Sequence, residues 1–256
     1  MRNIVKNSLG FESNIYVYQD KDMFNYSVDT ILLGNFVSIN GGIKNILEIG
    51  TNNGALSIFI SERKKDLKID AIEIQEKAIK IAEKNLKLNN KKEIKLIHED
   101  FNDFYKRHNK EEMKKYDSIV CNPPFYKVDK TNKRKGSEEL YIATHEVKMN
   151  LEQLISGSAK IIKQKGYLTL VMPTERLVDI FELMRKYDFE PKRIQFIHPR
   201  INDKSNLVLV EGRYKAGWGP HFLKNIYLHD ENLKGHEYRE EVKKLYKPLK
   251  FVKGRK

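Results

Sequence analysis

The tetrapeptide Asn122-Pro123-Pro124-Phe125 places an amide, two prolines and an aromatic ring directly after a run of apolar residues. The run, residues 116–121, has the composition of a short buried strand. The prolines end this strand, because proline donates no hydrogen bond to a sheet and fixes its own φ angle. Asn122 and Phe125 are therefore expected at the carboxyl edge of a sheet, where open α/β sheets bind ligands. A simple turn is the alternative interpretation.

A glycine-containing turn connects a predicted strand, residues 45–49, with a helix that is predicted to begin at Ala55. Its sequence is Glu48-Ile49-Gly50-Thr51-Asn52-Asn53-Gly54. Glycine allows a ligand to approach the backbone closely, and Asn52 stands where such turns often carry glycine and tolerates a left-handed conformation. Glu73 follows the next strand about twenty residues later, where a carboxylate can accept both hydroxyls of a ribose. The pattern fits a dinucleotide cofactor or S-adenosylmethionine, although the Gly-x-Gly-x-x-Gly fingerprint fails at Asn52 and Ala55. An ordinary strand-to-helix turn is the alternative.

Asp100 and Phe101 end a third predicted strand, residues 94–98. A carboxylate and a backbone N–H at that position could bind the edge of an adenine, with the Phe101 ring packed nearby. The alternative is that Asp100 caps a helix and Phe101 is a core residue.

The elements that must position these residues alternate between strand and helix. Strands are predicted at 14–19, 45–49, 68–74, 94–98, 116–121, 166–172, 194–197 and 207–210, and helices at 31–36, 55–60, 75–90, 146–164 and 175–187. Alternation with short connections predicts a mostly parallel sheet with helices on both faces. The last two strands have no helix between them, which predicts a hairpin and one antiparallel strand.

Composition limits the class of protein and its partners. With 256 residues and 40 % hydrophobic residues, the chain can form one large globular domain, expected over 1–235, followed by a basic helix or tail over 236–256. No apolar stretch approaches the ~20 residues of a membrane span, and the N-terminus lacks the apolar segment of a signal peptide, so we expect a cytoplasmic protein. Cys121 is the only cysteine, which excludes an intrachain disulfide and a cysteine-based zinc site. The net charge of +13 favours a polyanionic partner.

The order of these motifs resembles that of the class I S-adenosylmethionine-dependent methyltransferases. Asn-Pro-Pro-Phe narrows the resemblance to enzymes that methylate a planar amino or amide nitrogen. The segment Phe24-Asn25-Tyr26-Ser27-Val28-Asp29-Thr30-Ile31-Leu32-Leu33 resembles the bacterial tRNA1(Val) adenine-N6 methyltransferases, which modify the adenine at position 37 beside the anticodon. The resemblance covers residues 20–215. It implies an α/β fold with a Rossmann-like, seven-stranded, mostly parallel sheet, one antiparallel strand and helices on both faces.

The resemblance also implies roles for individual residues. The catalytic residues would be Asn122, Pro123, Pro124 and Phe125. The residues that bind S-adenosylmethionine would be Tyr26, Asp29, Thr30, Glu48, Gly50, Thr51, Asn52, Gly54, Glu73, Ile74, Asp100, Phe101 and Asn122. Independently of the resemblance, their charge and their position after the tetrapeptide favour phosphate binding by loop residues, with Arg200 a further candidate for the same face; the candidates are Lys127, Lys130, Lys133, Arg134, Lys135 and Arg200. The partner would be the anticodon loop of a tRNA, without a metal or a membrane, and the oligomeric state stays open with a monomer as the expectation.

The tetrapeptide suits this chemistry for a physical reason. The lone pair of an adenine amino group is delocalised into the ring, which makes the nitrogen a poor nucleophile. The Asn122 side-chain oxygen and the Pro123 carbonyl can accept its two N–H bonds and aim the lone pair at the methyl group, while Phe125 stacks on the base. Three alternatives remain open: an rRNA guanine-N2 methyltransferase, a protein glutamine N5-methyltransferase, and an RNA-binding module with an inactive methyltransferase fold. The basic charge and the lack of a helical N-terminal domain argue against the glutamine enzyme.

Overall fold

A single twisted sheet forms the centre of the protein, and β3, in its middle, is parallel to both of its neighbours. The computed structural model describes residues 3–11, 13–23, 25–123, 149–231, 235 and 237–253. Within them the strands run in the order β10-β8-β9-β7-β6-β3-β4-β5, and β11 also pairs with β8. The bounds are β3 Asn45–Ile49, β4 Lys68–Glu73, β5 Ile94–His98, β6 Tyr116–Cys121, β7 Ile162–Pro173, β8 Phe189–His198, β9 Leu207–Tyr214, β10 His221–Phe222 and β11 Ile226–Tyr227.

The predicted strand directions are confirmed. β9 is antiparallel to both β7 and β8, and every other pairing in this sheet is parallel. The β8–β9 hairpin explains the inversion, because no helix returns the chain to the opposite edge. Seven longer strands make up the expected sheet, and β10 and β11, of two residues each, extend it beyond the prediction.

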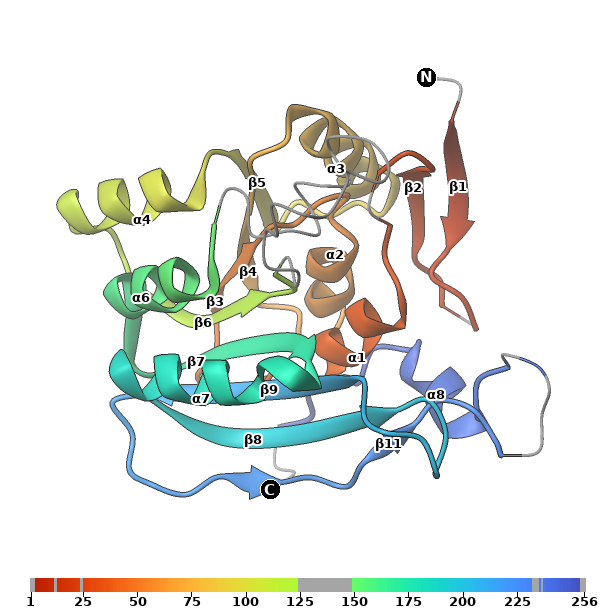
Figure 1. The fold of residues 1–256 in the computed structure, drawn as a ribbon. Helices are drawn as coiled ribbons and strands as arrows, with labels where there is room; N and C mark the ends of the chain where they lie inside the picture. Colours follow the sequence, from red (N-terminus) through yellow and green to blue (C-terminus); the bar gives the residue numbers. More distant parts are fainter. Residues whose placement is uncertain are drawn as a thin grey trace, which may run out of the picture.

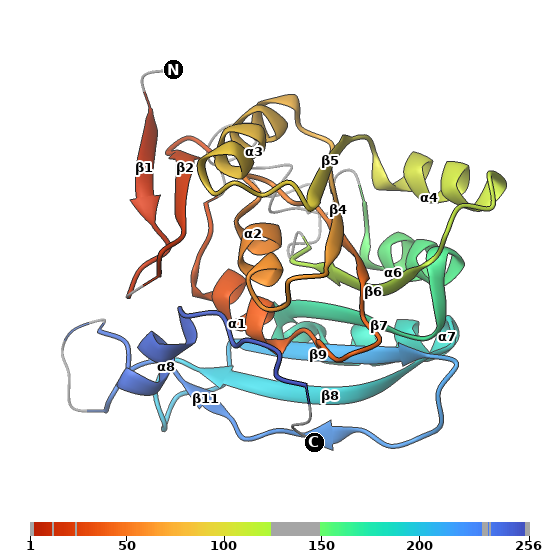
Figure 2. The ribbon, with the colours of Figure 1, turned by 180° about the vertical axis from the view of Figure 1, so that it is seen from behind.

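Helices cover both faces of the sheet, as expected (Figures 1 and 2). One core contains side chains from α1, α2 and α3, and the other contains side chains from α4, α6 and α7. Neighbouring residues of β3 supply opposite cores, Ile46 the first and Leu47 the second, because successive side chains of a strand point to opposite faces. The bounds are α1 Val28–Phe36, α2 Ala55–Ser61, α3 Glu76–Leu88, α4 Phe101–Lys110, α6 Leu151–Ile161 and α7 Leu177–Lys186.

Several predicted boundaries differ from those observed. The helix expected over 146–164 is described from Leu151 and ends at Ile161, because Ile162 already pairs with Tyr116 as the first residue of β7. The helix expected over 175–187 is a short 3₁₀ turn, Thr174–Arg176, followed by α7. Among the described residues, no helix combines the length and the apolar character needed to cross a membrane.

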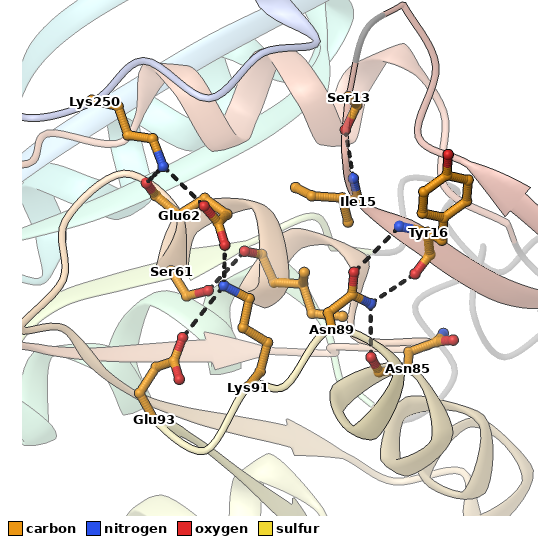
Figure 3. A network of polar contacts seen from close by, with 11 residues as sticks. Ser13, Ile15, Tyr16, Ser61, Glu62, Asn85, Asn89, Lys91, Glu93 and Lys250 are labelled. Carbon is orange, nitrogen blue, oxygen red and sulfur yellow. Dashed lines mark hydrogen bonds and ion pairs between the residues drawn. The ribbon is translucent and has the colours of Figure 1, made fainter.

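A two-stranded ribbon, β1 Ile4–Ser8 and β2 Tyr16–Asp20, precedes the sheet, and β1 was not predicted. Asn85 of α3 and Asn89 at its C-cap bond the free edge of β2, and Figure 3 shows the bonds of Asn89 to Tyr16. Asn85 Oδ1 accepts from Tyr18 N at 2.6 Å and its Nδ2 donates to Tyr18 O at 2.9 Å, and Asn89 bonds both backbone groups of Tyr16. Four residues of helix rise ~6 Å, close to the ~6.6 Å of two strand residues, so the two side chains match the strand.

The C-terminal segment packs on the body of the protein. Its helix α8, Glu240–Leu245, is short, and the side chains of Val242 and Tyr246 are buried. Asn35 of α1 donates to Leu245 O at 2.6 Å and accepts from Leu249 N at 3.0 Å. Further along, Lys250 pairs with Glu62, which also pairs with Lys91 (Figure 3). The described part of the segment expected as a basic helix or tail is therefore anchored to α1 and the end of α2.

Candidate functional site

A pocket lies at the carboxyl ends of β3, β4 and β6, and most of the predicted cofactor residues line it. Those in its lining are Tyr26, Thr30, Glu48, Gly50, Thr51, Asn52, Glu73, Ile74, Asp100, Phe101 and Asn122. Gly54 is the residue before α2, and its neighbours Asn53 and Ala55 reach the lining instead. Asp29 lies in the first turn of α1, which Ser27 caps by accepting from Asp29 N, and it is outside the lining.

The turn between β3 and α2 brings backbone to the surface of the pocket. Gly50, Asn52 and Gly54 all have left-handed φ angles, of 74°, 50° and 80°. The N–H groups of Gly50 and Thr51 both donate to Ile72 O of β4 at 2.9 Å, which fixes the turn. Apart from its two chain neighbours, no described residue has an atom within 4 Å of a Cβ added at Gly50, which leaves space for a ligand over this glycine.

Glu73 and Glu48 are buried carboxylates on opposite sides of this turn. Glu73 accepts from Asn52 N and Gln75 N, both at 2.9 Å, and burial raises the pKa of its carboxyl. A carboxylate has about four acceptor sites, so Glu73 keeps capacity for ligand hydroxyls. Glu48 accepts from Thr51 Oγ1 at 2.8 Å and from Ser57 Oγ, and burial raises its pKa to about 7. Glu48 thus links Thr51 of the turn with Ser57 of α2.

For Asp100 and Phe101 the structure confirms the helix cap and the core position, and both residues also line the pocket. Asp100 caps α4, because its Oδ1 accepts from Asn102 N at 2.7 Å. Phe101 is buried in the second core beside Tyr105, with 5.4 Å between ring centroids. Both residues also line the pocket, so the cap and the core contact hold them rigidly at its edge.

Asn122 follows β6 and presents an unpaired acceptor to the pocket. Its Oδ1 is buried and has no hydrogen-bond partner in the described ranges, and neither has Asn53 Nδ2 or Gln75 Oε1, which belong to the same lining. Buried polar atoms are almost always hydrogen-bonded in folded proteins. Three unpaired polar groups around one pocket therefore indicate a polar ligand. Pro123 is buried, and Pro124 and Phe125 lie outside the described residues.

Comparison with known proteins identifies the family. Residues 17–187 match the family described as the methyltransferase small domain. The chain belongs to this methyltransferase family. The matched region contains the whole pocket lining, from Tyr26 to Met149.

Relatives with curated names agree with this assignment. A protein of Christiangramia forsetii named tRNA1(Val) (adenine(37)-N6)-methyltransferase is 27 % identical over 89 % of this chain and 91 % of its own length. One of the same name from Flavobacterium psychrophilum is 30 % identical over 70 % of this chain and 74 % of its own. Among solved structures, a predicted O-methyltransferase, protein Atu636 from Agrobacterium tumefaciens, has a TM-score of 0.67 at 17 % identity over 88 % of this chain and 98 % of that one. The methyltransferase fold is therefore supported by sequence and by structure.

Of the predicted RNA-binding residues, Arg200 alone belongs to the described part of the chain, and it is not in the pocket lining. Lys127, Lys130, Lys133, Arg134 and Lys135 lie outside the described residues. Arg200 follows β8 at the same edge of the sheet and donates to Gly235 O at 3.2 Å, so it contacts the C-terminal segment.

Several lining residues of the methyltransferase pocket were missed from sequence. They are Ile49, Asn53, Ala55, Leu56, Ile72, Gln75, Glu99 and Met149. Ile49 is the last residue of β3, and Ile72 lies one residue before the end of β4. A position at the end of a strand was therefore a signal in the sequence for the edge of the pocket. Gln75 directly follows the predicted Ile74 and supplies one of the unpaired acceptors. Met149 comes from the segment before α6, and only the fold brings it here.

Proposed function

We propose that this methyltransferase transfers the methyl group of S-adenosylmethionine to N6 of an adenine in tRNA, at position 37 beside the anticodon of tRNA1(Val). The observation that carries the proposal is the buried, unpaired Oδ1 of Asn122 in the pocket, directly before Pro123. The two relatives described above are named for adenine methylation in tRNA, which supports the choice of adenine and of tRNA. The basic chain, with a net charge of +13, fits an RNA partner.

The pocket residues fit S-adenosylmethionine, which supplies an activated methyl group on a sulfonium. Glu73 would accept the ribose hydroxyls, and Asp100 with Phe101 would border the adenine of the cofactor. Gly50 and Gly54 would flank the methionine part, and the turn leaves space over Gly50. Tyr26, Asp29 and Thr30 would close over the methionine end, and Glu48, Thr51, Asn52 and Ile74 would complete the contacts. The unpaired Asn53 Nδ2 and Gln75 Oε1 are additional polar partners for the same ligand.

Asn122 and Pro123 would hold the amino group of the target base. The Asn122 Oδ1 and the Pro123 carbonyl accept its two N–H bonds, which favours a tetrahedral nitrogen with its lone pair directed at the methyl group. Pro124 keeps the backbone in position, and Phe125 stacks on the base, a contact worth about 1–3 kcal/mol. Methyl transfer from a sulfonium depends on alignment more than on a strong base. The base must leave its stack to reach the pocket, which costs least in a single-stranded loop.

The surroundings of the site complete the proposal. Lys127, Lys130, Lys133, Arg134 and Lys135, in the segment after the tetrapeptide, would contact phosphates close to the reacting base, with Arg200 on the same edge. A tRNA substrate places the protein in the cytoplasm.

The first test is methyl transfer from labelled S-adenosylmethionine to unmodified total tRNA, with digestion and nucleoside mass analysis. We expect N6-methyladenosine. N2-methylguanosine would instead assign the guanine reaction. Cofactor binding without any methylated nucleoside would reject tRNA as the substrate and direct the search to ribosomal RNA, DNA and protein.

The second test is the variant Asn122→Ala, which removes the unpaired acceptor. We expect kcat to fall about 10²- to 10³-fold, as for the loss of one preorganised hydrogen bond to a reacting group, with cofactor affinity largely kept. Cys121→Ala, at the preceding buried position of β6, is the control for local packing. Normal turnover of Asn122→Ala would remove this residue from the mechanism.

A further inference from the structure

A second cavity lies between the β1–β2 ribbon, the start of α1 and the segment around α8. Figures 1 and 2 both show the ribbon and α8 on the same side of the molecule, next to α1. Residues from near both ends of the described chain line this cavity, from Val5 to Tyr246. The mechanism proposed above uses only one of its lining residues, Tyr26.

Two buried amide oxygens in the lining of this cavity lack hydrogen-bond partners among the described residues. In the ribbon Val5 pairs with Gln19, and Asn7 lies two residues after Val5, so these three side chains share one face, and all three line the cavity. Gln19 is only 6 % exposed, yet its Oε1 has no hydrogen-bond partner among the described residues. Asn25 Oδ1, in the same lining, is also buried and unpaired there. Two such acceptors in one cavity indicate a ligand that donates hydrogen bonds.

Aromatic rings form the opposite wall. Phe11 lies in the turn between β1 and β2 with a φ of 35°, which is uncommon for a bulky residue, and it remains 43 % exposed. Its ring packs edge-to-face on Tyr246, with 4.9 Å between centroids, and lies 6.2 Å from the ring of Tyr238. An unusual backbone conformation that holds an exposed ring at the mouth of a cavity suggests a ligand with a flat apolar face.

Positive charge lies close to these rings. Lys21 belongs to the cavity lining, and the Nζ atom of Lys243 lies 5.8 Å from the centroid of the Phe11 ring. Stacking rings, amide groups and neighbouring ammonium groups together match the chemistry of a nucleotide: the rings contact the base face, the amides its polar edge and the lysines its phosphate.

We propose that this cavity binds a second nucleobase of the RNA substrate, one that neighbours the methylated adenine in the same single-stranded loop. The proposal rests on the proposed function. Tyr26 connects the two sites, because it lines both cavities and its hydroxyl donates to Ser8 O of the ribbon at 2.6 Å. A base in the second cavity therefore contacts the ring that borders the cofactor pocket, and its presence positions the target adenine.

The experiment uses unmodified anticodon stem-loop RNAs, each with one abasic site at a loop position other than the target. For the wild-type protein, we expect one position at which the abasic site lowers kcat/KM about tenfold, the size of one lost base–aromatic contact. Two variants remove the partners of that base: Gln19→Met keeps the volume without the amide, and Phe11→Leu removes the ring. We expect each variant to raise KM for intact RNA about tenfold. For each variant, the abasic site at the critical position should then lower kcat/KM much less than it does for the wild type, because the contact is already lost.

The controls separate this role from a structural one. Trp218→Ala changes another aromatic residue, 93 % exposed and outside the cavity, and should respond to every abasic site like the wild type. KM for S-adenosylmethionine should stay within about twofold in both cavity variants. If Gln19→Met does not fold, Phe11→Leu at its exposed position still gives the answer.

Two results would overturn the inference, and they differ from each other. Methyl transfer to RNA with independent, multiplying losses for variant and abasic site at every position would reject the second base site alone. An absence of methyl transfer from the wild-type protein to any RNA would reject the proposed function and this inference with it.

Discussion

Asn85 connects the N-terminal ribbon to the cofactor turn, and its replacement by alanine should affect both. Its side chain is fully buried and makes three hydrogen bonds: it accepts from Tyr18 N at 2.6 Å and donates to Tyr18 O at 2.9 Å and to Asn53 O at 2.8 Å. The bonds to Tyr18 hold β2, and the bond to Asn53 holds the turn before α2. Alanine supplies none of them.

The magnitude follows from the burial of the partners. Each of the two part-buried bonds to Tyr18 contributes about 1 kcal/mol net, and a buried Asn53 carbonyl without a donor costs about 1–3 kcal/mol. The free energy of unfolding should therefore fall by about 3–5 kcal/mol, which corresponds to a decrease in Tm of about 10 °C for a domain of this size. The affinity for S-adenosylmethionine should fall as well, because Asn53 lines the pocket.

The matched control is Asn89→Ala, at the C-cap of α3 one helical turn after Asn85. Asn89 makes the same pair of bonds with Tyr16, but these are exposed and one of them is long, at 3.3 Å. Its Nδ2 also donates to Asn85 O at 2.8 Å, a part-buried bond. Water can replace the two exposed bonds, so we expect a loss of about 1 kcal/mol, from the third bond. Calorimetry and urea unfolding measure the stabilities, and titration calorimetry measures cofactor affinity. Equal destabilisation by the two variants, or a melting temperature of Asn85→Ala within 2 °C of wild type, would refute the reasoning.

Three further predictions test the site and the fold. Glu73→Gln should weaken binding of S-adenosylmethionine about 10- to 100-fold by titration calorimetry, the loss expected for hydrogen bonds to a charged group, whereas the exposed Glu76→Gln should not; equal affinities would exclude the ribose contact. Burial raises the pKa of Glu48 from 4.5 to about 7. Between these two pH values the folded protein keeps a proton that the unfolded chain has lost, so the contribution of Glu48 to the free energy of unfolding falls as the pH rises. In urea unfolding, the free energy of unfolding of Glu48→Gln should increase by about 3 kcal/mol relative to that of the wild type as the pH rises from 4 to 8. Parallel pH profiles of the two proteins would contradict this. Deletion of residues 249–256 removes the carbonyl that accepts from Arg63 Nε at 3.0 Å. It should lower the free energy of unfolding by about 2–4 kcal/mol and leave cofactor affinity unchanged. A deletion variant that melts at the same temperature as the full-length protein would show that these contacts contribute nothing.

The central sheet could be predicted because its strands are rich in apolar residues and are followed closely by glycine, acidic or proline residues. The same logic placed Glu73 and Asn122 at one edge, since the carboxyl ends of parallel strands meet there. The left-handed conformation expected for Asn52 is confirmed by its φ of 50°. β1 escaped prediction because it pairs only with β2, and Asn85, 67 positions after Tyr18 in the sequence, holds β2 in place.

The packing of the C-terminal segment was hidden by its composition. Its many lysines indicated a solvated helix or tail, yet Tyr238, Val242 and Tyr246 recur every four residues, which is the spacing of an apolar helical stripe. Val242 and Tyr246 are buried, and Tyr238 packs against the first core. The stripe is short and surrounded by charge, so periodicity alone does not identify what it packs against.

Asn35 and Leu249 are bonded although 214 positions separate them, which affects the order in which the nascent chain can fold. At the usual 5–20 residues per second, the ribosome adds Leu249 about 10–40 s after Asn35. The turn before α2 is synthesised early in this interval, and β11, the last described strand of the sheet, ends at Tyr227. Tyr238 and Tyr246, which line the cavity beside the ribbon, follow both. With the functions proposed for the two cavities, the nascent chain therefore completes the cofactor turn before the cavity for the second base.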